Sequence, residues 1–296
     1  MAADPILPIE SDLDFPSAER SRAWKKFWGH PMAVIGVSGL IFVILFSFVG
    51  PIIYHVDGNG NTPNLLYLMN PPSAKFPLGT DQLGRDYLSR VMVGGQLSLI
   101  VGFSAAFATM IIGVAYGLLS GYAGGVVDVV MMRIVDILLS IPSLFVLLLL
   151  DAMFVPSAFM LVFIIAFTSW FGIGRLVRAE VLSVKRRDYV EAARAFGASA
   201  WRIMLKELLP NVMGTVMVAT TFQVAGAIIT IATLSFLGLG LPPPTPNWGA
   251  LLSQSMSYMY QGSWWLIYPP GILLLLTMLS FNFISEALRG AVDSRM

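Results

Sequence analysis

The sequence predicts an all-α integral membrane protein with six transmembrane helices. Of its 296 residues, 56% are hydrophobic and 12% are charged, against a charged share of roughly a quarter in ordinary soluble domains. The apolar residues gather in six continuous runs, and continuous rather than alternating runs select helices over the strands of a barrel. A helix of about 20 apolar residues crosses a hydrocarbon layer of about 30 Å. This composition excludes a soluble enzyme, a disordered chain and a nucleic-acid-binding protein.

The six apolar runs give the bounds of the expected transmembrane spans. The expected spans are 31–54, 91–120, 129–154, 157–177, 211–238 and 265–286. The first run is longer than the apolar part of a cleaved signal peptide, so it is interpreted as an uncleaved membrane helix. Pro142 is expected to kink the third span, and a very tight turn at Val155 and Pro156 is expected to lead into the fourth.

The chain therefore divides into four parts. The expected parts are a cytoplasmic amino-terminal tail at 1–30, the first span with an outer segment at 31–90, a membrane core at 91–290 and a cytoplasmic tail at 291–296. The core includes a cytoplasmic loop at 180–210. In the outer segment, a surface helix capped by Thr80 or Asp81 is expected before the second span, with a side-chain pair between Asp86 and Arg90 four residues apart.

Basic residues set the orientation, because they stay on the cytoplasmic side of membrane helices. With the amino terminus inside, the inner side holds 15 of the 18 Lys and Arg residues. Only Lys75, Arg85 and Arg90 fall outside, and residues 208–285 contain no formally charged side chain. The sequence thus predicts a multi-pass protein of the cell membrane with both termini in the cytoplasm.

Arg133, Asp136 and Asp151 are formal charges that lie within the expected spans. A proton or ion relay would need ionisable groups at the midplane, whereas Arg133 and Asp136 lie at the cytoplasmic mouth and are spaced to pair locally. Asp151 lies near the outer end. The expected role of these charges is therefore structural.

An intramembrane enzyme lacks its chemical groups in this chain. There is no cysteine, and His30 and His55 are the only histidines, so no metal site is expected. The spans contain no lysine that would activate a serine, and no P-loop sequence occurs. We expect no catalytic residue and no cofactor in this chain.

Residues 188–211 carry the strongest functional signal. Asp188 is expected to cap a helix, with Glu191 reaching back to it, and Gly197 is expected to end that helix through a positive φ. Ser199 then caps a second helix, which Pro210 is expected to stop where the next span starts. The alternative is an amphipathic helix that merely lies on lipid headgroups.

The spacing Glu191-Ala192-Ala193, then Gly197, then Leu209-Pro210 resembles the E-A-A loop of membrane subunits of binding-protein-dependent ABC importers. The resemblance implies that this short helix seats in a groove of an ATPase subunit and transmits its closure. Glu207 departs from the family pattern, which usually has an apolar residue there. The residues that the resemblance assigns to ATPase coupling are Glu191, Ala192, Ala193, Gly197, Ser199 and Arg202.

Two other segments narrow the resemblance. Residues 76–90 and residues 234–249, the latter containing Pro243, Pro244, Asn247 and Trp248, look like the corresponding segments of permeases of the dipeptide, oligopeptide and nickel group, C-type subunit. The proline run resists helix and sheet and is expected to form a rigid loop on the outer face. Such a loop plugs the pathway or receives the binding protein, and these four residues are the candidates for that contact.

Small and hydroxyl residues crowd the fifth span. Thr220, Thr221, Gln223 and Thr230 are candidates for a translocation path that offers hydrogen bonds without fixed charge. The alternative is ordinary packing through small residues, with each threonine bonded to its own helix.

The resemblance implies a type I ABC importer permease fold and half of a translocation pathway for di- or oligopeptides. The implied partners are a homologous second permease, two ATPase subunits that bind ATP and magnesium, an external substrate-binding protein and membrane lipid, with no nucleic acid. Importers of nickel complexes, glutathione or oligosaccharides in the same family remain alternatives. A passive channel or secondary carrier is the competing class, and it would usually show midplane ionisable groups or broken-helix sites.

Overall fold

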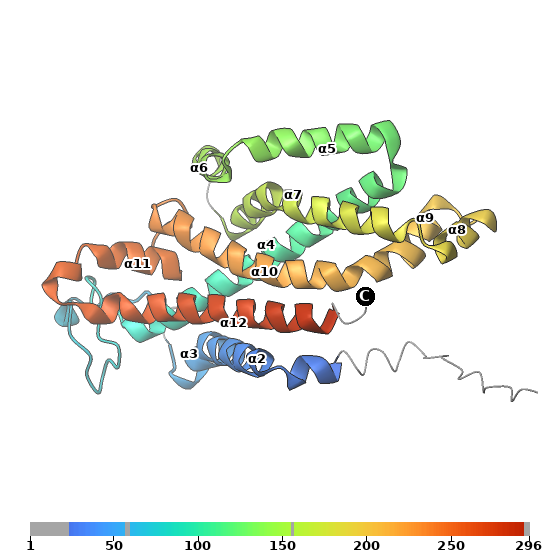
Figure 1. The fold of residues 1–296 in the computed structure, drawn as a ribbon. Helices are drawn as coiled ribbons and strands as arrows, with labels where there is room; N and C mark the ends of the chain where they lie inside the picture. Colours follow the sequence, from blue (N-terminus) through green and yellow to red (C-terminus); the bar gives the residue numbers. More distant parts are fainter. Residues whose placement is uncertain (1–23, 57–59, 155–156, 293–296) are drawn as a thin grey trace, which may run out of the picture.

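The computed structural model describes residues 24–56, 60–154 and 157–292, and these residues form a bundle of long helices (Figure 1). Five helical stretches are long and apolar enough to cross a membrane, namely Pro31–Ile53, Tyr87–Ala123, Ala158–Val184, Ala200–Phe236 and Trp264–Val292. A bent pair of helices, Gly125–Ser140 and Ser143–Met153, makes a sixth when it is counted as one span. Within the described ranges, the expected all-α membrane fold is confirmed.

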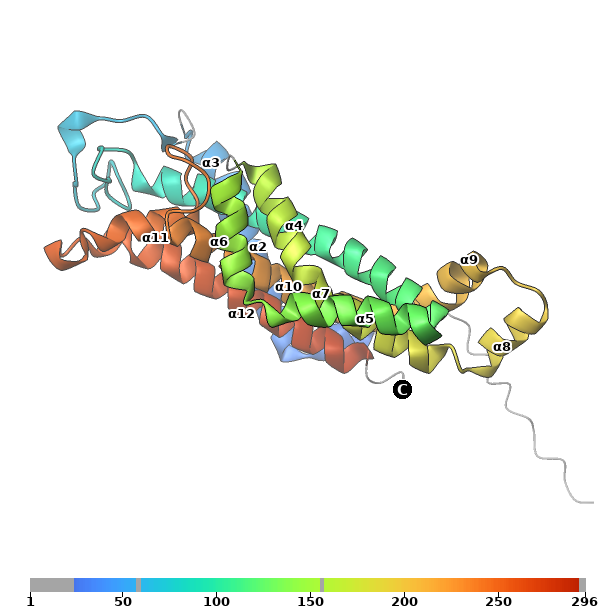
Figure 2. The same cartoon turned by 90° about the horizontal axis from the view of Figure 1, so that it is seen from above.

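The first span is built from α2 (Pro31–Ile44), a π-helical segment η1 (Leu45–Val49) and α3 (Gly50–Ile53). It lies along α12 (Tyr268–Val292), as both ribbon views show (Figures 1 and 2). Two glycines of α2 allow the close approach: a Cβ atom on Gly36 would lie 2.7 Å from the Ser280 carbonyl oxygen, and one on Gly39 would lie 2.4 Å from the Ser280 hydroxyl.

The most extensive helix interface joins α4 (Tyr87–Ala123) and α7 (Ala158–Val184). Gly113, Gly117 and Gly121 recur every four residues on α4 and face α7. A Cβ atom at Gly117 would lie 2.6 Å from the carbonyl oxygen of Gly174. The hydrophobic effect does not drive helices together in lipid. They associate there by close packing of this kind through small residues. The glycine row therefore fixes the distance between the two central helices.

The expected third span is wrong as a continuous helix. It consists of α5 (Gly125–Ser140) and α6 (Ser143–Met153), whose axes differ by 81°. The physical reason is Pro142, because proline disfavours the helical conformation at the preceding residue, and Ile141 is extended, with φ −89° and ψ 124°. The break is larger than the expected kink. The predicted turn at Val155 and Pro156 lies outside the described residues.

The outer segment does not contain the expected surface helix. Apart from the short 3-10 helix η3 (Leu65–Tyr67), its described residues run through turns up to Asp86, which caps α4 by accepting a hydrogen bond from the Leu88 amide. Gly79 and Gly84 have φ values of +65° and +69°, which end any helix there.

The charged groups of this segment also pair differently from the prediction. The Asp81 carboxylate, not that of Asp86, meets both Arg85 at 2.7 Å and Arg90 at 3.4 Å. All three residues of this pairing are buried, with 5% or less of each residue exposed. The outer segment is therefore folded onto the end of α4 and does not lie flat as a separate helix.

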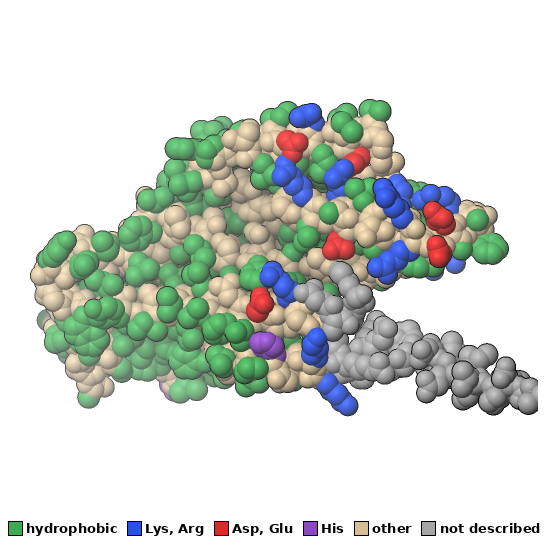
Figure 3. Space-filling view, viewed as in Figure 1, with side chains coloured by type: hydrophobic (Ala, Val, Ile, Leu, Met, Phe, Trp, Pro, Cys, Tyr) green, Lys and Arg blue, Asp and Glu red, His purple; other side chains and the backbone are tan. Residues whose placement is uncertain are grey.

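The rest of the bundle is α8 (Asp188–Ala195), α9 (Ala200–Arg202), the π-helical segment η4 (Ile203–Leu208), α10 (Leu209–Phe236), α11 (Trp248–Met256), η5 (Met259–Gln261) and η6 (Trp264–Leu266). Figure 1 places α8 and α9 at one end of the long axis, and α11 with the outer segment at the other. Charged side chains gather towards the α8 end (Figure 3). On the face shown, one end is charged and the other is dominated by apolar and uncharged side chains.

Prediction for the central interface. Gly117→Ala inserts a methyl group where a Cβ atom would lie 2.6 Å from the Gly174 carbonyl oxygen. Overpacking of this kind costs about 1–3 kcal/mol, so the melting temperature of the purified protein in detergent should fall by several degrees. The matched control is Gly226→Ala in α10, where a Cβ atom meets nothing within 4 Å. An equal loss in both variants would contradict the role of the glycine row.

Candidate functional site

The loop after α7 folds as helix, glycine and helix, as expected. Gly197 follows α8 with φ +77°, and Ser199 caps α9 by accepting a hydrogen bond from the Arg202 amide. Val190 of α8 is fully buried in a cluster that includes Ile203 of η4. These contacts hold α8 at an angle to α9, so that the pair projects from the end of the bundle (Figure 2).

Two details of the predicted loop are wrong. Arg187, not Asp188, is the cap residue of α8, and it makes no side-chain cap bond; Asp188 is the first helical residue. Pro210 does not stop a helix, because the helical stretch runs without a break from Ala200 to Phe236. The six π-helical residues of η4 end two positions before the proline, and Pro210 stands near the start of α10, where a missing amide hydrogen is tolerated.

The outward face of this loop combines apolar and charged groups. Phe196 is 91% exposed and Trp201 is 65% exposed. Glu191, Ala192 and Arg202 of the same loop are also exposed. Aromatic residues with charged neighbours are typical of protein–protein contact sites, so this surface has the composition of a docking site.

The loop is tied to the bundle by a lysine at its base. The Lys185 ammonium donates hydrogen bonds to the carbonyl oxygens of Gly121, at 3.3 Å, and Tyr122 at the end of α4. These are the last carbonyls of a helix, where a cation is favoured. Burial, together with the like charge of Arg194 on α8, lowers the pKa of Lys185. Lys185 therefore connects the ends of the two most closely packed helices to the start of the loop.

Two ion pairs join α5 to α7 near the same end. Arg178 holds Asp128 with both its Nε and Nη2 groups, and Ser120 also donates to this buried carboxylate. One turn earlier on α7, Arg175 pairs with Asp136. The predicted local pair between Arg133 and Asp136 is wrong, since Asp136 reaches across to α7. The sequence spacing could not reveal this partner because Arg175 lies 39 residues away.

Asp151 is the remaining acid of the bent pair. It is 4% exposed, and among the described residues neither of its carboxylate oxygens has a hydrogen-bond partner. It packs on the side of α6 that faces the bundle, whereas the sequence predicted only a position near the outer end of the span.

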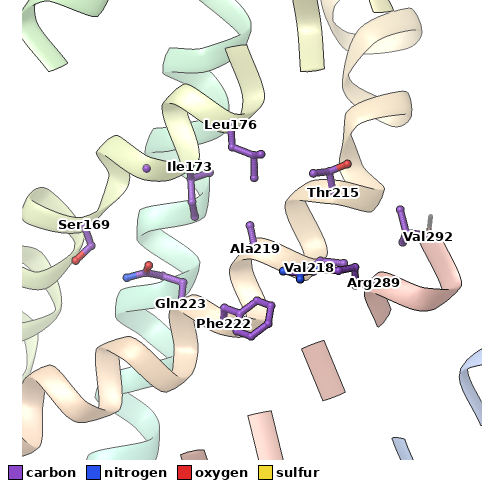
Figure 4. Close-up of a pocket in the computed structure, with 11 residues that line it drawn as sticks. Ser169, Ile173, Leu176, Thr215, Val218, Ala219, Phe222, Gln223, Arg289 and Val292 are labelled. Carbon is purple, nitrogen blue, oxygen red and sulfur yellow. The ribbon is translucent and has the colours of Figure 1, made fainter. Parts of the chain in front are cut away.

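A cavity of about 420 Å³ opens between α7, α10 and α12 (Figure 4). Ile173, Leu176 and Ala219 form apolar walls, whereas Ser169 and Gln223 supply polar groups. Among the described residues that line it, Arg289 of α12 is the one with a charge. Its guanidinium carbon lies 5.4 Å from the centre of the Phe222 ring. The size falls in the usual range for small-molecule sites, about 300–1,000 Å³.

Of the four candidate path residues, only Gln223 lines this cavity. The hydroxyl groups of Thr220, Thr221 and Thr230 each donate to a carbonyl four residues earlier in α10, at 2.8 to 2.9 Å. This is the backbone bonding that the alternative interpretation of the fifth span describes. Arg289, Phe222 and Ser169 were missed because they come from three helices that the sequence order keeps apart.

Of the four residues proposed to contact a binding protein, two are exposed in the outer loop and two are buried. Pro243 and Pro244 are exposed. Asn247 and Trp248 are 1% and 0% exposed, so the prediction for these two is wrong. Asn247 caps α11, and the Trp248 indole donates to the Val91 carbonyl at 3.0 Å. The reason is that α11 folds back into the bundle and buries its first turn.

Among the described residues, no group of three or more His, Cys, Asp or Glu side chains is placed to hold a metal ion.

Comparison with known proteins adds family relationships to this geometry. Residues 113–296 match the family described as binding-protein-dependent transport system inner membrane component, and residues 20–72 match the N-terminal TM domain of oligopeptide transport permease C. The dipeptide transport system permease protein DppC of Bacillus subtilis is 37% identical, over 93% of this chain and 85% of its own length. The oligopeptide transport system permease protein OppC of Haemophilus influenzae is 38% identical, over 99% of this chain and 95% of its own.

A solved structure shares the fold. A chain of the MetNI methionine ABC transporter, in inward facing conformations, aligns with a TM-score of 0.56 at 20% identity, and the match covers 70% of this chain and 96% of that one. This similarity supports the helix arrangement expected for a type I importer permease.

Prediction for the α5 attachment. Arg178→Met leaves the buried Asp128 carboxylate without its main partner, and breaking a buried pair costs about 3–5 kcal/mol. Because the chain has no cysteine, a cysteine at Val135, which is fully buried on α5, can report the position of this helix. We expect Arg178→Met to expose this cysteine to alkylation. The matched control is Arg175→Met, whose pair is 47% exposed on both sides and should be worth about 0–1 kcal/mol. Equal protection of this cysteine from alkylation in both variants would refute the role of the Arg178–Asp128 pair in holding α5.

Proposed function

The chain belongs to the family of binding-protein-dependent transport system inner membrane components, and from this premise we propose that it forms half of the peptide path of an ATP-driven importer. The proposal is supported most directly by relatives named dipeptide and oligopeptide transport permeases, which match it over nearly their whole length. The same names favour peptides over nickel complexes, glutathione or oligosaccharides as cargo. Among the described residues, the spans hold no midplane relay of ionisable groups, which also disfavours a secondary carrier.

The loop with Glu191, Ala192, Ala193, Gly197, Ser199 and Arg202 is assigned to ATPase coupling. Its support is geometric: an angled helix pair projects from the charged end, exposes Phe196 and Trp201, and is continuous with α7 and α10 on either side. A push on α8 therefore acts on two long helices of the bundle at once. The homologous second permease, two ATPase subunits and an external binding protein complete the proposed assembly.

ATP acts on this chain only through its partners. ATP and magnesium are bound in the ATPase subunits, which carry out hydrolysis, and this chain contributes no catalytic residue. Closure of the ATPase pair shifts the population between inward-open and outward-open states, and it does so only by the difference in its affinity for the two. The loop at α8 is the element through which that difference reaches the membrane helices.

The charged end faces the cytoplasm in this proposal. Basic residues on this side agree with the positive-inside rule, and they include Lys185, Arg186, Arg187 and Arg194 next to α8. Both termini then lie in the cytoplasm, and Pro243 and Pro244 are exposed on the outer side, where the binding protein delivers cargo.

Prediction for coupling. Gly197→Val places a β-branched residue at φ +77°, a conformation that costs an L-residue about 1–2 kcal/mol. The turn between α8 and α9 should distort, so that peptide uptake and co-purification of the ATPase subunits fall at least several-fold. Gly262→Val, at φ +76° with open space around it at the other end, carries the same backbone strain and should retain both. Unchanged uptake in Gly197→Val would overturn the coupling role.

Prediction for orientation. Phe196 and Tyr260 are 91% and 95% exposed at opposite ends of the molecule, and the absence of native cysteine makes single replacements unambiguous. A membrane-impermeant maleimide should label Tyr260→Cys in intact cells with a permeabilised outer envelope. It should label Phe196→Cys only after the inner membrane is opened. The reverse pattern would invert the proposed topology.

A further inference from the structure

The described residues that line the cavity between α7, α10 and α12 include one cation, Arg289, and are otherwise neutral (Figure 4). We propose that this cavity receives the peptide cargo on its way through the membrane and holds the free C-terminal carboxylate of the peptide at Arg289. This inference rests on the proposed function, because it takes peptide as the cargo. It adds the residue that recognises the C-terminal carboxylate, a feature that unmodified linear peptides share.

The Arg289 side chain is held in position by its neighbours, and those neighbours do not occupy all of its hydrogen-bond donors. Its guanidinium lies over the Phe222 ring at 5.4 Å, a cation–π contact that orients the group. Its one acidic neighbour among the described residues, Glu286, lies 3.7 Å away, and both side chains of that pair are more than half exposed. Such an exposed, long pair is worth little. Arginine has five N–H donors in a planar fork, so it keeps free donors for a carboxylate.

The opposite part of the cavity suits a peptide backbone. Ser169 and Gln223 line it, and neither side chain is engaged in a hydrogen bond with another described residue. A carboxamide and a hydroxyl both donate and accept, as an amide backbone requires. Thr215, in contrast, is already bonded to Glu180 at 3.3 Å.

The dimensions match a short peptide. Thr215 and Gln223 both line the cavity from α10, and eight helical residues span about 12 Å. An extended chain covers about 3.3–3.6 Å per residue, so this length corresponds to three or four residues. The walls between the polar ends are formed by Ile173, Leu176 and Ala219, which tolerate side chains of different kinds. Among the described lining residues, the single cation fixes the carboxyl end of the peptide, and the neutral groups leave the identity of its side chains open.

The experiment uses trialanine and trialanine amide, which differ only in the carboxylate. A cysteine replaces Leu176 on the cavity wall, and the importer complex is purified without binding protein, so that selection by the binding protein plays no part. We expect trialanine to slow alkylation of this cysteine. The amide should need a concentration about ten-fold higher, the scale of one hydrogen bond to a charged group.

Variants test whether Arg289 causes that difference. Arg289→Gln should remove the preference for the free acid while leaving protection by the amide unchanged. Glu286→Gln, the matched control, keeps the cation and should keep the preference. Phe222→Leu removes the supporting ring and should reduce it. Arg289→Lys retains the charge and serves if Arg289→Gln fails to assemble, with a reduced preference expected.

Uptake of trialanine by the complete importer separates the two possible failures. If the importer takes up trialanine but the acid and the amide protect equally, or Arg289→Gln keeps the preference, this inference is overturned and the proposed function stands. If the complete importer takes up no peptide, the proposed function fails and the inference fails with it. Uptake together with an Arg289-dependent preference supports both.

Discussion

The close approach of α4 and α7 is the constraint on which the remaining architecture depends. Three glycines in register bring the two backbones together, and the Gly174 carbonyl occupies the space that a side chain on Gly117 would fill. In lipid this packing replaces the hydrophobic drive that holds soluble bundles together. The amino-terminal end of α4 supports the buried Asp81 cluster and Trp248, and the carboxyl-terminal end of α7 leads directly into α8. One interface therefore connects the outer segment to the loop at the opposite end.

The charged groups lie around the pair of α4 and α7 and not within the interface between these helices. Lys185 binds the last carbonyls of α4, and the Arg178–Asp128 and Arg175–Asp136 pairs draw α5 towards α7. The bent α5–α6 segment otherwise exposes many apolar side chains, among them Val126, Val129 and Phe145. Its position therefore depends on these ion pairs near the loop after α7 and on a small apolar cluster of Val135 with Trp170 and Phe171. This arrangement places a loosely packed segment beside the element proposed to receive motion from the ATPases.

Local rules predicted the elements more reliably than the partners of individual side chains. Gly197 and Ser199 behave as their residue types require, because a positive φ and a cap involve only neighbours in sequence. Two errors are local, namely the cap of α8 and the helix expected before the second span, and most of the others concern residues whose environment comes from elsewhere. Asp136 pairs across helices, Asn247 and Trp248 are buried by the return of α11, and Pro210 continues a helix after a π-helical segment. The break at Pro142 was visible in the sequence as a kink, but its 81° angle was not.

The sequence by itself determined the membrane class, the approximate spans, the helix-glycine-helix loop and the family resemblance. These properties follow from the length of apolar runs, the distribution of basic residues and motifs of adjacent residues. The tertiary structure decided which groups meet: Arg289 with Phe222 beside Gln223, Asp81 with two arginines, and α4 with α7 at glycine distance. The physical reason is that side chains on different helices are brought together by packing, and the spacing along one chain carries no information about the rotation of a helix towards its neighbours.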